Sequence, residues 1–310
     1  MSSARESAGA EPRRPELALP ALDAAGAVLL TELALANLRR RGLAVSASVA
    51  GTIRLANGIS FGLHNLATVA ATRRRQDWAG LVERHFAAIL NAGLDQHDYQ
   101  HDPSRWYLKL RLAAELPGPS DYAQQVLPGV LALAAIDTPA VVQEALTRSG
   151  KPWLADLAAF TRRATRNLAE LPAPELITVR ADPALATSRV HLFQTEDFYG
   201  ASRLLVLANL LREQLGIEGS EAGYLVAVPH RHLLIVHRIS DTPAMLAAIR
   251  LIGPLAEREH ASKPGPISPH VYLLGPDAPP EQVSRLTENG LAVQASGQFG
   301  ALVVRLPGED

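Results

Sequence analysis

The sequence predicts an α+β protein with antiparallel or mixed sheets, arranged as two related helix–hairpin–helix–strand halves joined by a helical segment. Three observations lead to this prediction: a repeated hexapeptide, a hairpin pattern after each copy, and a helix after each hairpin. Separate hairpins and helices favour this class, because a doubly wound parallel sheet needs strands and helices in strict alternation.

The hexapeptide repeat is the first observation. Residues 33–38 read LALANL and residues 205–210 read LVLANL, so five of six residues agree at an offset of 172 positions. Each copy precedes a glycine, Gly42 or Gly216. A glycine just past an apolar stretch of helical spacing is typical of a helix end, so we expect a helix at each copy.

A hairpin pattern follows each copy. Residues 53–63 surround Asn57-Gly58, the strongest short signal for a tight turn between two strands. The same offset leads from Gly58 to His230, which lies between two apolar runs within residues 224–236. We therefore expect a second strand–turn–strand unit at the equivalent position.

A helix follows each hairpin. The first is expected to open near Asp77. The second is expected behind Asp241 or Thr242, both preferred N-cap residue types, with Pro243 in the first turn where proline is tolerated. An offset that holds through helix, hairpin and helix predicts an internal duplication.

The remaining elements complete the organisation. We expect an amphipathic helix at residues 154–168, a turn at 297–300, and strands at residues 106–112, 130–136, 175–180, 189–194, 271–274 and 301–306. The chain is thus divided into a disordered tail (1–20), a first α+β half (21–137), a helical connector (138–172) and a second α+β half (173–310).

Composition argues against several classes of function. The net charge is −1, so no overall basic field predicts binding to nucleic acid or to an anionic membrane. The chain has no cysteine, which excludes disulfides, thiolate metal sites and a cysteine nucleophile, and suits a reducing compartment. No apolar run reaches the ~18 residues of a membrane span. The high usage of alanine, leucine and arginine is typical of a GC-rich bacterial genome, so we expect a bacterial cytoplasmic protein.

Linear motifs for phosphate binding and hydrolysis are absent. The chain has no P-loop, no dinucleotide-binding glycine pattern, no zinc-protease helix motif and no serine nucleophile elbow. Arginine runs at residues 39–41 and 73–75 end or flank expected helices, and aromatic residues do not interleave with them as base stacking requires. We expect no cofactor.

Three motifs of the second half resemble the YtpQ-like family of bacterial proteins. They are NLAELP at residues 167–172, FYGASRLL at residues 198–205 and VAVPH at residues 226–230. The resemblance is best over residues 153–240, whereas the first half agrees only in the order of its elements. It implies an α+β fold. Because the family's function is unknown, it implies no reaction, substrate or catalytic residue.

Glu196, Asp197, Tyr199 and Arg203 lie where a helix over residues 198–215 is expected to begin. The two carboxylates suit a metal ligand or a general base, and Tyr199 with Arg203 suits an anionic substrate. Carboxylates at a helix N-terminus also offset its free N–H groups and its dipole, so capping alone explains them.

His230, Arg231 and His232 form the turn of the second hairpin. Two histidines on one side of the chain beside an arginine favour an anion site or a partner contact, since loops held by rigid strands often carry sites. A polar turn between two buried strands explains the same residues.

His97, His101 and Asp102 are the candidates for a metal site. On a helix, His97 and His101 share one face, and with a carboxylate they can bind a divalent cation. Gly93 and Pro103 bracket this stretch, which favours a polar loop instead. A functional zinc site also needs a supported set of three protein ligands, so we expect no bound metal.

These residues are consistent with three functions. The first is a non-catalytic binding or adaptor protein that recognises another protein. It predicts an open sheet edge or an exposed apolar patch, and no cluster of titratable groups with shifted pKa values in a cleft. The alternative is a hydrolytic or metal-assisted enzyme with a site between the start of the 198–215 helix and the 229–232 turn. The third is a homo-oligomeric structural subunit.

Overall fold

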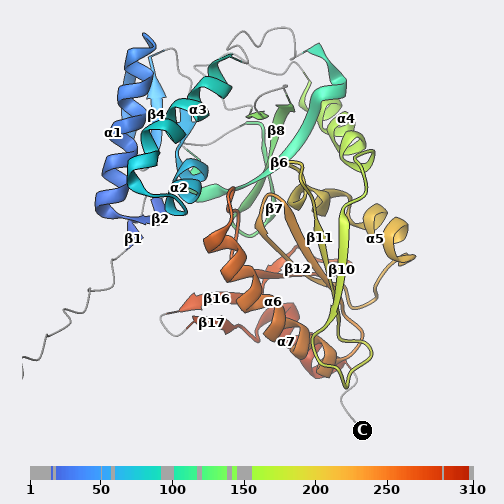
Figure 1. Ribbon diagram of the computed structural model, residues 1–310. Helices are drawn as coiled ribbons and strands as arrows, with labels where there is room; N and C mark the ends of the chain where they lie inside the picture. Colours follow the sequence, from blue (N-terminus) through green and yellow to red (C-terminus); the bar gives the residue numbers. More distant parts are fainter. Residues whose placement is uncertain are drawn as a thin grey trace, which may run out of the picture. The chain divides into compact units, whose positions relative to one another are not determined.

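The protein has a mixed α+β fold in which the paired strands run antiparallel, which confirms the predicted class (Figure 1). The computed structural model describes residues 15–16, 19–49, 51–56, 60–91, 101–116, 121–137, 142–144, 156–287 and 290–306. The chain forms two compact units, residues 1–87 and 88–310.

Unit 1 combines helices with short strands. Its strands are β1 (Pro15–Glu16), β2 (Leu19–Asp23), β3 (Val45–Val49), β4 (Thr52–Leu55) and β5 (Ser60–Gly62). Its helices are α1 (Ala24–Arg40), α2 (His64–Ala71), the 3₁₀ turn η1 (Arg75–Asp77) and the start of α3 (Trp78–Asn91). β3, β4 and β5 form one sheet, so the predicted first hairpin is confirmed. Its expected turn residues, Asn57 and Gly58, lie outside the described residues.

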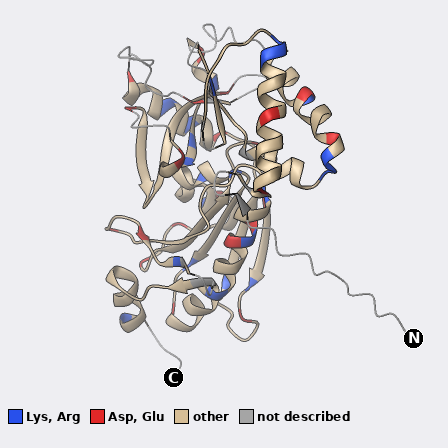
Figure 2. Ribbon diagram, turned by 90° about the vertical axis from the view of Figure 1, so that its left-hand side faces the viewer, with Lys and Arg blue, Asp and Glu red and all other residues tan. Residues whose placement is uncertain are grey.

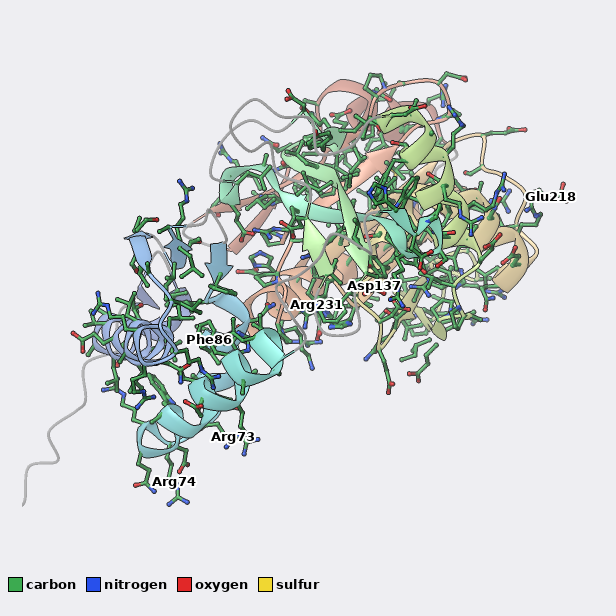
Figure 3. All side chains as sticks on the ribbon, turned by 90° about the horizontal axis from the view of Figure 1, so that it is seen from above. Arg73, Arg74, Phe86, Asp137, Glu218 and Arg231 are labelled. Atoms are coloured by element: carbon green, nitrogen blue, oxygen red, sulfur yellow. The ribbon has the colours of Figure 1, made fainter. Side chains whose placement is uncertain are left out.

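Two short strands precede α1. β1 pairs with β2, and Leu19 is buried, so this leucine attaches the chain before α1. Within the arginine run at residues 73–75, Arg73 and Arg74 are exposed and point away from the unit (Figure 3). Arg75 lies over the ring of Trp78, the first residue of α3, so the run flanks a helix as expected.

Unit 2 contains two larger sheets. In the four-stranded sheet, β8 (Val130–Asp137) pairs with β6 (Trp106–Leu112), β7 (Ala123–Leu127) and β9 (Val142–Glu144). The six-stranded sheet has the order β10 (Glu175–Arg180), β11 (Arg189–Gln194), β13 (Leu233–Arg238), β12 (Tyr224–His230), β14 (Val271–Leu274) and β15 (Glu281–Gln282). A separate hairpin joins β16 (Ser284–Thr287) and β17 (Gly290–Val293). The strands predicted before residue 275 are confirmed.

The helical elements of unit 2 are the 3₁₀ turns η3 (Pro103–Arg105), η4 (Ala113–Glu115) and η5 (Ala201–Val206), and the helices α4 (Leu157–Ala169), α5 (Leu207–Leu215), α6 (Thr242–Ser262) and α7 (Gly297–Arg305). Of the two residues expected to cap α6, Asp241 is the N-cap: its Oδ1 accepts a hydrogen bond from the Ala244 amide at 2.8 Å, and Thr242 is the first residue of the helix.

Both faces of the central hairpin β12–β13 are buried. Along β12, Leu225 and Ala227 pack in the core that contains α6, whereas Val226 and Val228 pack in the core that contains α4. Successive side chains of a strand point to opposite faces, so one continuous apolar run serves two cores. The end of β12 and its turn are therefore held by packing from both sides.

The prediction for the C-terminal residues is wrong. The expected strand at residues 301–306 lies mostly in α7, and the expected turn at 297–300 is the first turn of that helix. Phe299 and Leu302 are buried at helical spacing, whereas Val304 is 88% exposed. β-branched valines suggested a strand, but burial follows the helical period.

The two hexapeptide copies have different local structures. Residues 33–38 lie inside α1, whereas residues 205–210 span the junction of η5 and α5. Asn37 is buried and hydrogen-bonds Glu83, while Asn209 Oδ1 accepts from Arg212 at 3.2 Å. Within the expected helical connector, the described residues form the strand β9 as well as the helix α4.

Candidate functional site

The two sequence-predicted stretches of the second half meet in the structure. We call residues 195–203 and the turn His230–His232 together the hairpin corner. The Thr195 amide donates to the His232 carbonyl at 3.0 Å, and the Ala201 amide donates to the Arg231 carbonyl at 3.0 Å. Backbone hydrogen bonds thus attach one stretch to the other.

A glycine makes this close approach possible. A Cβ added to Gly200 would lie 2.6 and 2.7 Å from the carbonyl carbon and oxygen of His232, and 2.5 Å from Thr195 Oγ1. Real side chains do not tolerate such contacts with backbone, so residue 200 must be glycine for the corner to close.

Asp197 and Arg203 form a bidentate ion pair inside the corner. Arg203 Nη1 donates to Asp197 Oδ1 at 3.1 Å and Arg203 Nη2 donates to Oδ2 at 2.9 Å. Asp197 Oδ1 also accepts from the Tyr199 amide at 2.7 Å, and Arg203 Nη2 donates to the Pro172 carbonyl at 2.9 Å. The Arg203 side chain is 3% exposed. Both side chains therefore have their hydrogen-bonding groups engaged within the fold.

The structure differs here from the predicted helix start. Residues 195–200 are not helical, η5 begins at Ala201, and α5 begins only at Leu207. Asp197 does not cap η5, whose N-cap position is occupied by Gly200 without a side-chain hydrogen bond. The pairing of Asp197 with Arg203 explains the difference, because it holds the chain in a turn before the helix.

Tyr199 is buried and its ring stacks on Tyr107 with ring centroids 4.4 Å apart. Its hydroxyl has no hydrogen-bond partner. Burial raises the pKa of Tyr199 far above its usual range, and the nearby carboxylate of Asp137 raises it further. The hydroxyl therefore stays protonated and is unsuited to act as a base.

His232 has both ring nitrogens engaged. Arg231 Nε donates to His232 Nε2 at 2.8 Å, so this nitrogen is an acceptor. The proton then lies on Nδ1, which donates to the Asp197 carbonyl at 2.7 Å. Burial lowers the pKa of His232 and the charge of Arg231 lowers it further, which keeps the ring neutral at pH 7.

His230 is a buried, neutral histidine. Its Nδ1 accepts from the His232 amide at 3.3 Å, and its Nε2 lies 3.6 Å from Glu259 Oε2. Burial, followed by the charges of His232 and Lys263, lowers the pKa of His230 to about 4. At neutral pH the contact with Glu259 is therefore a polar contact rather than an ion pair.

Arg231 is the second cation of the corner, after Arg203 (labelled in Figure 3). Its guanidinium carbon lies 4.2 Å from the centre of the Phe198 ring, and its stem packs against Gly265, where a Cβ would lie 2.7 Å from Arg231 Cδ. Burial lowers the pKa of Arg231 to about 10, so it remains charged at pH 7. Among the described residues, no carboxylate pairs with it.

A neighbouring ion cluster was not predicted from the sequence. Glu144 Oε1 accepts from Lys109 Nζ at 2.6 Å and from Arg111 Nη1 at 2.9 Å. Burial opposes ionisation of Glu144, but these two cations outweigh it and lower its pKa to about 2. Burial lowers the pKa of Lys109, and the positive charge of Arg231 lowers it further, whereas the negative charge of Glu144 raises it. The positions of this cluster and of Phe198 depend on strand pairing and loop packing, which leave no linear signal.

The other predicted residues lie apart from these contacts. Glu196 is exposed. Asp102 Oδ1 accepts from the Ser104 amide at 3.0 Å and so caps η3, while His101 is exposed and His97 lies outside the described residues. The part of the chain that the structure describes contains no group of three or more His, Cys, Asp and Glu residues suited to a metal.

One open depression of about 390 Å³ is lined by other residues, between the β10–β11 connection and α6: Asp182, Leu185, Thr242, Pro243, Leu246, Ala247 and Arg250. None of the predicted site residues lines it. Charged residues of both signs are distributed over many elements rather than gathered on one (Figure 2).

Comparisons with models of protein families, with curated proteins and with solved structures find no match to this chain. None of the described helices is long and apolar enough to cross a membrane.

Proposed function

We propose that this chain is a non-catalytic binding or adaptor protein that recognises another protein at the hairpin corner. The observation that carries this proposal is that some polar side chains of the corner have partners within the fold, whereas Arg231 has no carboxylate partner among the described residues. Asp197, Arg203 and His232 are engaged in internal hydrogen bonds. Arg231, by contrast, lies over the ring of the exposed Phe198, and this pair is available to a partner.

The alternative, a hydrolytic or metal-assisted enzyme, is favoured by the meeting of the two predicted stretches. Such an enzyme needs a base with a free lone pair within hydrogen-bond reach of its substrate. Asp197 is paired with Arg203, and both nitrogens of His232 already have partners. These contacts favour the binding function over the catalytic one.

The Phe198–Arg231 pair has the chemistry of a protein-binding surface. Phe198 is 39% exposed, so part of its ring surface is open to a partner. Aromatic and arginine side chains are enriched among the residues that contribute most to protein–protein affinity. Because the corner is attached to the rigid hairpin β12–β13, this pair is positioned before a partner arrives.

Photo-cross-linking in the native host tests the proposal. A photoreactive phenylalanine analogue replaces Phe198, and the control carries it at Ile177 on β10, which has a similar exposed fraction (40% against 39%). We expect one polypeptide to be captured from position 198 and not from position 177. Capture from neither position, or the same proteins from both, would contradict the proposal.

We also propose that residues 21–137 and 173–310 descend from one duplicated unit, and that the second half is related to the YtpQ-like family. Support comes from the common order of elements: α1 precedes the β4–β5 hairpin as η5 and α5 precede the β12–β13 hairpin. Sequence profiles built from relatives of each half test this. Profiles that fail to align at the 172-residue offset would contradict the duplication.

A further inference from the structure

The guanidinium of Arg231 is held in place but has an unused edge. Its Nε donates to His232 Nε2 at 2.8 Å, one face lies 4.2 Å from the centre of the Phe198 ring, and its stem contacts Gly265. Among the described residues, nothing accepts a hydrogen bond from its two terminal nitrogens. These contacts fix the orientation of the group and leave a two-donor fork open.

An unpaired charge of this kind is unusual in a partly buried position. Removing a charge from water is unfavourable unless a partner of opposite charge replaces the lost hydration. The other partly buried cations of this region have such a partner: Arg203 pairs with Asp197, and Lys109 and Arg111 pair with Glu144. Arg231 differs from them in lacking a carboxylate.

The geometry favours a single carboxylate as the missing partner. A guanidinium fork matches the two oxygens of a carboxylate, and the two hydrogen bonds that form are charge-assisted. A phosphate chain or nucleic acid usually needs several free cations, but Lys109 pairs with Glu144, and Arg111 pairs with both Glu144 and Glu115. The apolar ring of Phe198 beside the fork suits an apolar neighbour of that carboxylate.

We infer that Arg231 is the receptor for an acidic side chain, Asp or Glu, which the protein partner inserts next to an apolar residue resting on Phe198. This inference rests on the proposed binding function and names the chemistry of the partner. It assigns to Arg231 the bidentate contact, to His232 the orientation of the guanidinium, and to Phe198 the apolar contact.

The test is an NMR titration of the full-length protein labelled with ¹⁵N-arginine, observing the Arg231 Nε–H signal. The probes are acetyl-Leu-Glu-amide, its neutral analogue acetyl-Leu-Gln-amide, acetyl-Leu-Gln with a free C-terminal carboxylate, and inorganic phosphate. We expect saturable binding of acetyl-Leu-Glu-amide at least about tenfold tighter than of acetyl-Leu-Gln-amide. Phe198→Ala should weaken it severalfold, and Arg238→Ala, on the exposed end of β13, should leave it unchanged.

Several outcomes would overturn the inference. Equal affinity for the Glu and Gln amides would show that Arg231 does not recognise a carboxylate. Tighter binding of phosphate would show that its preferred ligand is another anion. Tighter binding of the peptide with a free C-terminal carboxylate would show that Arg231 recognises a chain terminus rather than an acidic side chain. If the cross-link at position 198 persists while acetyl-Leu-Glu-amide fails to bind, only this inference is lost. If acetyl-Leu-Glu-amide binds but the cross-link is absent, the proposed protein partner is lost, and only the preference of Arg231 for a carboxylate remains.

Discussion

Replacing Arg203 by methionine tests whether the Asp197–Arg203 pair is structural. Methionine keeps much of the buried stem but removes two hydrogen bonds to Asp197 and one to the Pro172 carbonyl. Breaking a buried ion pair by removing one partner destabilises a protein by about 3–5 kcal/mol. Asp197 is 32% exposed, and water can solvate it after the loss. We therefore expect a decrease of about 2–4 kcal/mol in the free energy of unfolding.

The assay is urea denaturation followed by tryptophan fluorescence, in which Trp106 reports on unit 2. Asp197→Asn and the double variant complete a mutant cycle, and we expect a coupling energy of about 1–3 kcal/mol between the two positions. Arg212→Met is the matched control, because Arg212 is an exposed arginine on α5 and should change stability by less than ~0.5 kcal/mol.

A small effect would refute this reasoning. If Arg203→Met lowers stability by less than about 1 kcal/mol, as an exposed pair would, the ion pair does not hold the corner together. A coupling energy near zero in the double-mutant cycle of Asp197 and Arg203 would lead to the same conclusion. Asp197 would then be a free carboxylate, and the catalytic alternative would regain support.

Three further predictions concern the same unit. Gly200→Ala places a Cβ within 2.7 Å of backbone atoms and should destabilise the protein by about 1–3 kcal/mol in urea, whereas Gly219→Ala, which meets nothing within 4 Å, should not. His230 has a folded-state pKa of about 4, below the ordinary value of 6.5, so the unfolded state binds more protons between these values. The contribution of His230 to stability should therefore be fully present above pH 6.5 and fall by on the order of 1–3 kcal/mol toward pH 4. His230→Gln should remove this part of the pH dependence in unfolding curves recorded across that range, whereas the part due to His260, whose pKa burial also lowers to about 4, should remain. Asp241→Ala removes the cap of α6 and should lower the thermal unfolding midpoint, equivalent to about 0.5–2 kcal/mol, while Ser296→Ala should not, because Ser296 makes no capping hydrogen bond to α7.

The sequence predicted elements whose pattern is local. β10 and β11 have the predicted bounds, and Asp241, one of the two residues expected to do so, caps α6. These predictions succeeded because residue spacing and capping chemistry act within a few residues of the chain. The strand expected at residues 301–306 failed because valine favours strands intrinsically, whereas the burial of Phe299 and Leu302 selects a helix.

The candidate site could be predicted only in part. The sequence identified the residue types of the corner but not their pairings. A turn brings Asp197 to Arg203, and the pairing of β11 with β13 brings it to His232. The sequence distinguishes Phe198 only as part of the YtpQ-like motif at residues 198–205, because no local pattern indicates that Arg231 lies over its ring. Contacts between distant segments, rather than composition, decide which polar groups remain available.

The turn that carries Arg231 is bonded on two sides. The segment at residues 195–201 donates two amide hydrogen bonds to it, while the Arg231 amide donates to the Gly265 carbonyl at 2.9 Å and the Ile267 amide donates to the Pro229 carbonyl at 2.9 Å. A connection between two strands is usually where insertions and deletions accumulate, because solvent accepts its backbone groups. Here one added residue would shift the register of three chain segments at once. Variation in length among relatives is therefore expected in other connections, and this turn should be aligned and engineered as part of the core.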